Sequence, residues 1–523
     1  MNSLNKRIDW VALGAIALYT VAAVLLISWD GYLYDEWPHY DVNWFYTCGK
    51  AWMNGMTPYV DFADSKGPLL WLIYGVGYLL SPHNYLGLFW LSCALYIWIF
   101  YWCYKSARLF TLNRWLALLV VAIVSVFMLS GLAHEEFKAE DWCNGLLAPV
   151  IYRFLLYAVA HRTDKRFVMR SALLLGFVLG ASFLIKYSCT LMFMAFVPYF
   201  GVAMPRNEGH SVARAWAWGL AGAILALAPM AAVLLAQGCL SDFLNEYILV
   251  TFATFGNMAG DSLTATKAWD ILTDWHMLVY LAGLAVSIFL YCWRVRRGAW
   301  LVAIAALWFL AVTLLNAAGR PYFNTLSTFA WYGVPVAVLL LAQWLDRKWL
   351  GIWVAVASLA ALFMTVRHNS FFRVPSLECE VSHYYGGLMA QYDHPRLLYL
   401  MSHDRGFGVY SQALPACKYW SLQVGYTPEM AADQINAVKE RKADVIFVNS
   451  SDNAMIELVE KMGYHRYDFT DVGVGEKEWQ RNLLYSRKPL TRTDQWPKVT
   501  PKDVLLKRIA SSYQTFAPND SLP

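Results

Sequence analysis

Uncharged apolar runs of about twenty residues recur along this 523-residue chain. Two of them extend from Trp10 to Trp29 and from Tyr85 to Tyr104 without a single charged side chain. A helix needs roughly 20 apolar residues to cross the hydrocarbon core of a bilayer. Hydrophobic residues make up 58% of the chain and charged residues only 15%, so we expect a polytopic helical membrane protein.

The apolar pattern predicts about 11 full transmembrane helices. They cover residues 10–29, 85–104, 115–133, 144–160, 171–185, 187–204, 215–237, 277–293, 298–315, 325–345 and 349–366. The first span follows only Lys6 and Arg7 and has no evident small-residue cleavage site, so we expect a retained helix and not a signal peptide. Residues 67–80 are too few for a full crossing and predict a re-entrant or short helix.

Lys and Arg residues concentrate in alternate connections, for example at 162–170 and 294–297. The positive-inside rule places these connections and the N-terminus in the cytoplasm. Loops 35–66, 134–141 and 317–324 then lie outside, together with everything after residue 366. We expect an integral protein of a plasma membrane, which in a bacterium is the inner membrane. The net charge of +5 is modest and dispersed, and it gives no case for nucleic acid.

The chain changes character near residue 367. Apolar runs shorten to strand length at 397–401, 444–448 and 483–485, and a helical pattern covers 428–441. The fold class expected is therefore an all-α polytopic membrane domain over residues 1–366 with a small C-terminal α/β extracytoplasmic domain over 367–494. A polar tail follows over 495–523.

The first outer loop is rich in acidic and aromatic residues. The loop ends at Lys66. Its acidic residues are Asp35, Glu36, Asp41, Asp61 and Asp64. Residues 41–55 have the pattern of a short amphipathic helix lying on the bilayer, with Asp41 at its N-cap. The residues alone favour equally a capping role and a general-base role for Asp41, and the two roles are compatible.

Motifs of this loop resemble the first external loop of C-type (GT-C) membrane glycosyltransferases, the superfamily of protein O-mannosyltransferases and bacterial aminoarabinose transferases. The motifs are Asp41, the turn from Gly55 to Asp61, and the segment Asp64-Ser65-Lys66-Gly67-Pro68-Leu69. The resemblance implies a GT-C-like transmembrane catalytic domain over residues 1–366, with 30–66 as its first outer catalytic loop. It also makes Asp41 the catalytic base.

The chain departs from the family pattern next to Asp41. Val42 stands where those enzymes often carry a Glu, and the pair Asp35-Glu36 occurs earlier in the loop. Asp35, Glu36 and Asp64 are therefore supporting candidates for the site.

A second outer loop, His134-Glu135-Glu136-Phe137, is similar to a Thr-Glu-Glu-Phe element of bacterial family members. The similarity makes Glu135 and Glu136 candidates for positioning the acceptor or for binding a divalent cation such as Mg or Mn, because hard cations prefer oxygen ligands. An isolated solvated turn would carry the same residues. Glu140 and Asp141 stay open as further candidates.

A third outer loop, Gly319-Arg320-Pro321-Tyr322-Phe323-Asn324, resembles the Arg/Tyr-His-Tyr segment of those relatives. Arg320 is suited to bidentate phosphate contacts, and Tyr322 and Asn324 are supporting candidates. An arginine that snorkels to the membrane interface explains Arg320 equally well.

Two further charges, Lys186 and Arg153, lie at the end of one predicted span and within another. Charges in a membrane are costly and often functional, although pairing with a carboxylate also explains Arg153.

The resemblance implies an inverting glycosyltransferase, either a hexosyl- or a pentosyltransferase. The expected partners are a polyprenyl-phosphate sugar donor, whose phosphate Lys66 and Arg320 hold, and an extracytoplasmic acceptor hydroxyl on a glycan, a lipid-linked glycan or a cell-envelope polymer. Asp41 takes the acceptor proton. The alternatives are a polysaccharide flippase or transporter and an O-antigen-type ligase. A flippase would place polar residues within mid-membrane helices, whereas this chain concentrates carboxylates in its outer loops.

Overall fold

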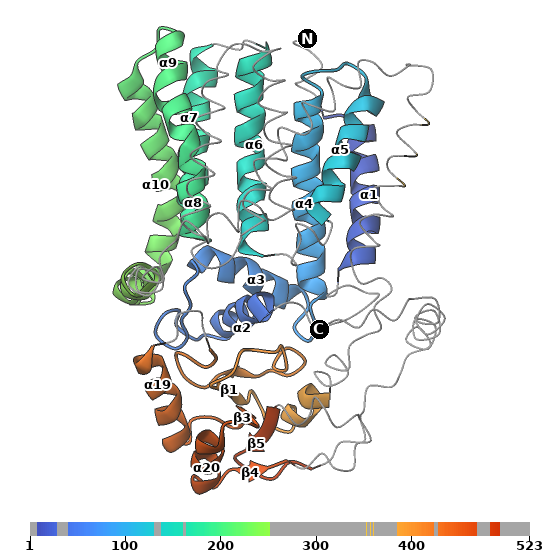
Figure 1. Ribbon diagram of the computed structural model, residues 1–523. Helices are drawn as coiled ribbons and strands as arrows, with labels where there is room; N and C mark the ends of the chain where they lie inside the picture. Colours follow the sequence, from blue (N-terminus) through green and yellow to red (C-terminus); the bar gives the residue numbers. More distant parts are fainter. Residues whose placement is uncertain are drawn as a thin grey trace, which may run out of the picture.

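The computed structural model describes residues 8–28, 40–129, 138–160, 164–251, 384–422, 427–467 and 482–491, with the single residues Ile352, Val356 and Leu359. A layer of long helices lies at one end of the molecule, two shorter helices lie across the end of that layer, and a small α/β domain follows (Figure 1). The long helices are α1 (Trp10–Ile27), α4 (Leu86–Ala107), α5 (Arg114–Leu129), α6 (Ala139–Ala160), α7 (Lys165–Phe183) and α10 (Val212–Ala236).

Several of these helices suit a bilayer by length and composition. Within the described ranges, α4, α7 and α10 are long and apolar enough to cross one. A fourth span forms if the bent pair Tyr187–Phe196 and Tyr199–Asn207, which turns by 40°, counts as one crossing. This pair contains α8 (Tyr187–Phe193), the 3-10 helix η1 (Met194–Phe196), the π-helix η2 (Tyr199–Ala203) and α9 (Met204–Asn207). Over its described residues, each predicted span up to residue 237 largely coincides with helix. Of the spans predicted from residue 277 onward, only Ile352, Val356 and Leu359 are among the described residues.

Helix α10 has the surface and the packing of a membrane helix. Leu220 and Leu235 are each 63% exposed, and apolar surface of this kind is stable against lipid. On its other side α10 packs closely against α7. A Cβ atom on Gly222 would lie 2.0 Å from the carbonyl oxygen of Leu173, so the glycine lets the two backbones approach.

The short helix predicted at residues 67–80 is present as α3 (Pro68–Leu80), which begins with a proline at its first position. Its 13 residues span about 20 Å, less than the hydrocarbon core. It lies across the end of the helix layer beside α2 (Tyr40–Met53) (Figure 1). The two helices touch at Gly49, where a Cβ atom would lie 2.4 Å from the backbone nitrogen of Gly75.

The predicted environment of the amphipathic helix is wrong. Nearly every described side chain of α2 is buried, including the polar Asn43, Thr47 and Lys50. The polar side of α2, which an amphipathic helix on a bilayer would turn toward water, contacts the α/β domain instead. Asp41 lies in the first turn of α2 and not at its N-cap. In the first turn its negative charge interacts favourably with the positive end of the helix dipole.

The α/β domain contains a five-stranded sheet of order β2-β1-β3-β5-β4. Its strands are β1 (Arg396–Leu400), β2 (Leu414–Pro415), β3 (Val445–Asn449), β4 (His465–Arg466) and β5 (Asn482–Ser486). β1 pairs in parallel with β2 and β3, whereas β5 pairs antiparallel with β3 and β4. The three predicted strands correspond to β1, β3 and β5, and the predicted helix is α19 (Pro428–Lys439).

The two faces of this sheet join different cores. Alternate residues of a strand point to opposite faces. Tyr399 pairs with Phe447 across β1 and β3, and these rings stack with centroids 5.3 Å apart in the core that continues to α2 and α3. Leu398 and Ile446 belong to a second core with residues of α19 and α20 (Asn453–Lys461). One face of the sheet therefore packs on the side of α2 and α3, and the other face is covered by α19 and α20 of the α/β domain.

Candidate active site

Two of the predicted site residues, Asp64 and Lys66, lie together where the first outer loop enters α3. The Asp64 side chain is buried, and its Oδ1 atom accepts hydrogen bonds from Ser65 N at 2.5 Å and Ser65 Oγ at 3.2 Å. The Lys66 ammonium donates to the same Ser65 hydroxyl at 3.2 Å. Ser65 thus connects the carboxylate to the lysine.

Asp41 belongs to the same electrostatic environment. Burial raises the pKa of Asp64, the positive charge of Lys66 opposes this rise, and the negative charge of Asp41 adds to it. The buried Oδ2 atom of Asp64 has no hydrogen-bond partner among the described residues. A buried carboxylate oxygen in this condition is costly unless a ligand or a proton satisfies it.

The backbone around Gly67 fixes the position of Lys66. Gly67 N donates to the carbonyl of Ile185 at 3.0 Å, and Leu69 N donates to that of Leu184 at 2.9 Å. A Cβ atom at Gly67 would lie 2.1 Å from the Leu184 carbonyl oxygen. The Lys-Gly-Pro element therefore needs glycine at its centre, because it lies directly against the end of α7.

An ion pair stands beside this contact. The Lys186 ammonium binds the Glu140 carboxylate, and both side chains are largely buried. Asp141 Oδ2 accepts from Lys138 N at 3.1 Å. The two open acidic candidates thus have structural partners, and the unusual charge at Lys186 is paired.

Tyr59 holds the loop against the membrane helices. Its φ of 64° lies in the left-handed region, and its ring lies 4.6 Å from that of Trp71. Its hydroxyl donates to the Lys66 carbonyl at 2.9 Å. The strained conformation is stabilised by this buried packing. Asp61, another acidic residue of the loop, accepts from Thr57 N at 2.7 Å and closes a local turn.

Asp404, which contacts α2 from the α/β domain, is not among the residues predicted for the site. Its Oδ2 atom accepts from Thr47 Oγ1 at 3.0 Å, and burial raises its pKa to about 6. The segment His403-Asp404-Arg405-Gly406 directly follows a predicted strand, which is a signal for a functional or structural turn. Its partner on α2 could not be read from this signal.

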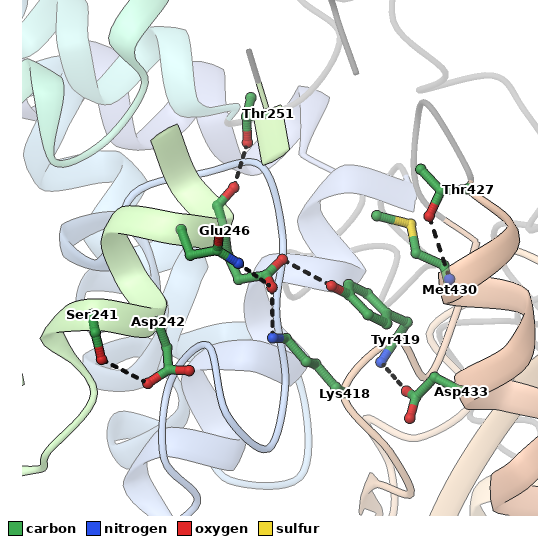
Figure 2. A network of polar contacts seen from close by, with 10 residues as sticks. Ser241, Asp242, Glu246, Thr251, Lys418, Tyr419, Thr427, Met430 and Asp433 are labelled. Carbon is green, nitrogen blue, oxygen red and sulfur yellow. Dashed lines mark hydrogen bonds and ion pairs between the residues drawn. The ribbon is translucent and has the colours of Figure 1, made fainter. Parts of the chain in front are cut away.

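A second connection joins the α/β domain to the end of the helix layer. Helix α11 (Leu240–Phe243) continues into the π-helix η3 (Leu244–Val250), which carries the buried Glu246. Lys418 binds Glu246 Oε1 at 2.6 Å, and the Tyr419 hydroxyl donates to Glu246 Oε2 at 2.8 Å (Figure 2). Tyr419 N donates to Asp433 Oδ2 at 3.0 Å, which links the contact to α19.

The remaining predicted site residues lie outside the described residues. They are Asp35, Glu36, Glu135, Glu136, Arg320, Tyr322 and Asn324. The described part of the chain contains no group of three or more His, Cys, Asp or Glu residues that could hold a metal ion. The cation expected at Glu135 and Glu136 therefore stays a prediction.

Solved structures with a similar fold match this chain over nearly its whole length. The chain is similar to ArnT from Cupriavidus metallidurans bound to undecaprenyl phosphate, with a TM-score of 0.59 and 11% identity, over 93% of this chain and 98% of that one. Against the apo state of that ArnT the TM-score is 0.61 at 10% identity, over 91% and 97% of the two chains. No protein-family model and no curated protein sequence matches the chain.

Proposed function

We propose that this chain is an inverting membrane glycosyltransferase that moves a sugar from a polyprenyl-phosphate donor to an acceptor hydroxyl. One observation carries the proposal. Asp41, Asp64 and Lys66 share one electrostatic environment at the end of a layer of apolar helices, in a fold similar to that of a protein solved with undecaprenyl phosphate. A lipid phosphate at this end of the helix layer would meet Lys66 beside the carboxylates of Asp41 and Asp64.

Lys66 is the proposed ligand of the donor phosphate. Among the described residues its ammonium makes one hydrogen bond, to Ser65 Oγ, and it lies 5.6 Å from the ring centroid of Phe45. An ammonium group has three donors, so donors remain for a phosphate. Arg320 is the second proposed phosphate ligand, on the grounds of the family resemblance.

Asp41 is the proposed general base. The acceptor oxygen attacks the anomeric carbon, and its proton passes to the Asp41 carboxylate. The bond between the anomeric carbon and the phosphate oxygen breaks, and polyprenyl phosphate leaves with the electron pair. Because one displacement occurs and no enzyme nucleophile takes part, the anomeric configuration inverts. Asp64 positions the turn that presents Lys66.

We place this chemistry on the extracytoplasmic side of a plasma membrane, together with the α/β domain, which we propose to comprise residues 367–494 and which contacts the first outer loop at Thr47 and Lys50. The proposed acceptor is a glycan, a lipid-linked glycan or a cell-envelope polymer. Glu135 and Glu136 are proposed to position it, or to hold a divalent cation that does so.

A donor-consumption assay tests the proposal. Purified protein in lipid nanodiscs is given synthetic polyprenyl-phosphate sugars together with an envelope extract that supplies acceptors. The expected result is release of polyprenyl monophosphate and a new glycoside of inverted configuration, seen by mass spectrometry and NMR.

The same assay distinguishes the alternatives. A flippase or transporter would leave the bond between sugar and phosphate intact. An O-antigen-type ligase would consume a polyprenyl diphosphate donor and ignore the monophosphate. Either result would contradict the proposed function.

A further inference from the structure

A cavity of about 450 Å³ lies between α4, α6 and α7, far from the candidate active site. It opens beside the first turn of α7, whereas the last turn of α7 leads to the contact with Gly67. The 19 residues of α7 cover about 28 Å, so one small ligand cannot reach both places. The first turn of α7 lies at the end of the helix layer opposite the α/β domain (Figure 1), so the cavity lined by residues of that turn lies at that end too.

Positive charge predominates in the lining of this cavity. Arg153, Arg166 and Arg170 all contribute to it, against the single carboxylate of Asp164. That carboxylate already accepts a hydrogen bond from Phe167 N at 2.9 Å, as the N-cap of α7. An anion entering the cavity would meet a net positive potential.

The three arginines are held differently. Arg153 is only partly exposed, its Nη1 atom donates to Ser171 Oγ at 3.2 Å, and its guanidinium lies 5.3 Å from the centroid of Phe167. Arg166 and Arg170 are exposed, are four residues apart on one face of α7, and have no ion-pair partner among the described residues. Arg153 is thus a preoriented cation at the cavity, and the other two are cations at its mouth.

The opposite wall is aromatic and apolar. The rings of Trp102 and Tyr152 lie 5.1 Å apart, and Leu156 lies beside them in the lining. The Lys105 ammonium lies 6.0 Å from the centroid of Tyr152, which adds a further cation next to the lining. A cavity with an apolar wall and a cationic mouth suits an amphiphile with an anionic headgroup.

We infer that this cavity binds the phosphate group of a lipid whose headgroup carries a net negative charge, from the leaflet opposite the α/β domain. Guanidinium groups bind phosphate through paired, charge-assisted hydrogen bonds, and the aromatic wall accommodates the start of the lipid chain. The inference does not depend on the transfer reaction, because it concerns a different surface and a different ligand. If these arginines only snorkelled to the interface, they would attract anionic lipid without a defined site.

Native mass spectrometry of the purified full chain tests the inference. The protein is titrated with phosphatidylglycerol, and in parallel with phosphatidylcholine of the same acyl chains. We expect a defined phosphatidylglycerol adduct that is weakened about tenfold or more in the double variant Arg166→Ala/Arg170→Ala, as the loss of two charge-assisted contacts predicts. The variant Arg166→Lys/Arg170→Lys should keep part of the binding.

A matched control removes two exposed arginines from the same end of the helix layer. Arg206 lies in α9 and Arg214 in α10, and neither lines the cavity. The control Arg206→Ala/Arg214→Ala should bind phosphatidylglycerol as the wild type does. Equal adducts in both double variants would overturn the inference, and so would equal binding of the two lipids to the wild type.

A competition arm separates two sources of phosphate. If inorganic phosphate displaces phosphatidylglycerol from the wild type but not from a nonspecific background, the phosphate site is supported and a soluble anion also fills it. If only lipid occupies the site, the headgroup is the ligand. Thermal unfolding midpoints of both double variants should match that of the wild type, since neither pair is buried in the core.

Discussion

The ammonium group of Lys50, on α2, lies 2.7 Å from the backbone carbonyl oxygen of Gly408 in the α/β domain. Lys50 is fully buried, and the carboxylate of Asp404 is the charge that acts on it. The first outer loop and the C-terminal domain therefore share a polar contact inside a continuous apolar core. The domain is part of the structure that positions the candidate site.

The first prediction concerns the pH dependence of stability. Burial lowers the pKa of Lys50 to about 7, whereas the unfolded chain keeps a value near 10.5. Between these values the unfolded chain binds more protons than the folded chain, so this group makes the free energy of unfolding rise with pH across the window. We expect Lys50→Met to lose that rise, which is at most about 1.4 kcal/mol per pH unit.

Thermal unfolding of the detergent-solubilised protein, followed by tryptophan fluorescence at pH values from about 7 to about 9, measures this difference. Lys461→Met is the matched control, because Lys461 is exposed on α20. Identical pH slopes for the wild type and Lys50→Met would show that Lys50 stays charged in the folded protein.

The second prediction concerns the connection between Glu246 and the α/β domain. Glu246→Gln removes the charge that binds Lys418 and Tyr419, and hydrogen bonds to a charged group are worth about 1.5 to 3 kcal/mol. We expect a lower unfolding midpoint and faster limited proteolysis within residues 384–491. Asp242→Asn is the control, because Asp242 bonds only Ser241 in Figure 2. Equal proteolysis of the two variants would show that the contact does not hold the domain.

The third prediction concerns donor binding. Lys66→Ala should weaken donor use by about 1.5 to 3 kcal/mol, which corresponds to a roughly ten- to hundredfold higher donor requirement. The apparent affinity for the acceptor should change much less. Titration of polyprenyl-phosphate sugar at fixed acceptor measures both effects. An unchanged donor titration would make Lys66 an ordinary interfacial cation and would remove the support for a phosphate site beside Ser65.

The fourth prediction concerns orientation. The charge pattern places the α/β domain outside and the connection before α7 in the cytoplasm. In a cysteine-free background, an impermeant thiol reagent added to intact cells should label Ser451→Cys and leave Asp164→Cys unlabelled. Both positions are exposed in the structure. Labelling of residue 164 with protection of residue 451 would invert the proposed topology.

Much of the fold follows from patterns that a sequence carries locally. Apolar runs predict α4 and α10, and a buried run of β-branched and aromatic residues predicts β3, because burial and periodicity act over neighbouring residues. The closure at Lys66 could be predicted as well, since Gly67 and Pro68 fix the start of α3. The burial of α2 could not, because its polar residues contact residues more than 350 positions away.

For the candidate site too, the sequence predicts the residues that lie close together along the chain but not the contacts between distant segments. Asp41, Asp64 and Lys66 lie within one loop, and the motif spacing that relates them is local. The pairing of Lys186 with Glu140 joins two helices, and no local pattern specifies it. Asp404 was missed for the same physical reason, because its partner Thr47 lies in a different domain.

The measurement that tests the proposed mechanism most directly is single-turnover transfer by Asp41→Asn. Asparagine is nearly isosteric with aspartate but cannot take up the acceptor proton, so it separates proton transfer from structure. The proposal predicts that transfer falls at least about a hundredfold, the lower range for loss of a general base, while insertion, the unfolding midpoint and donor binding stay at wild-type levels. Near wild-type transfer by Asp41→Asn, with a loss of activity in Asp64→Asn or Glu36→Gln, would contradict the assignment of Asp41 as the base.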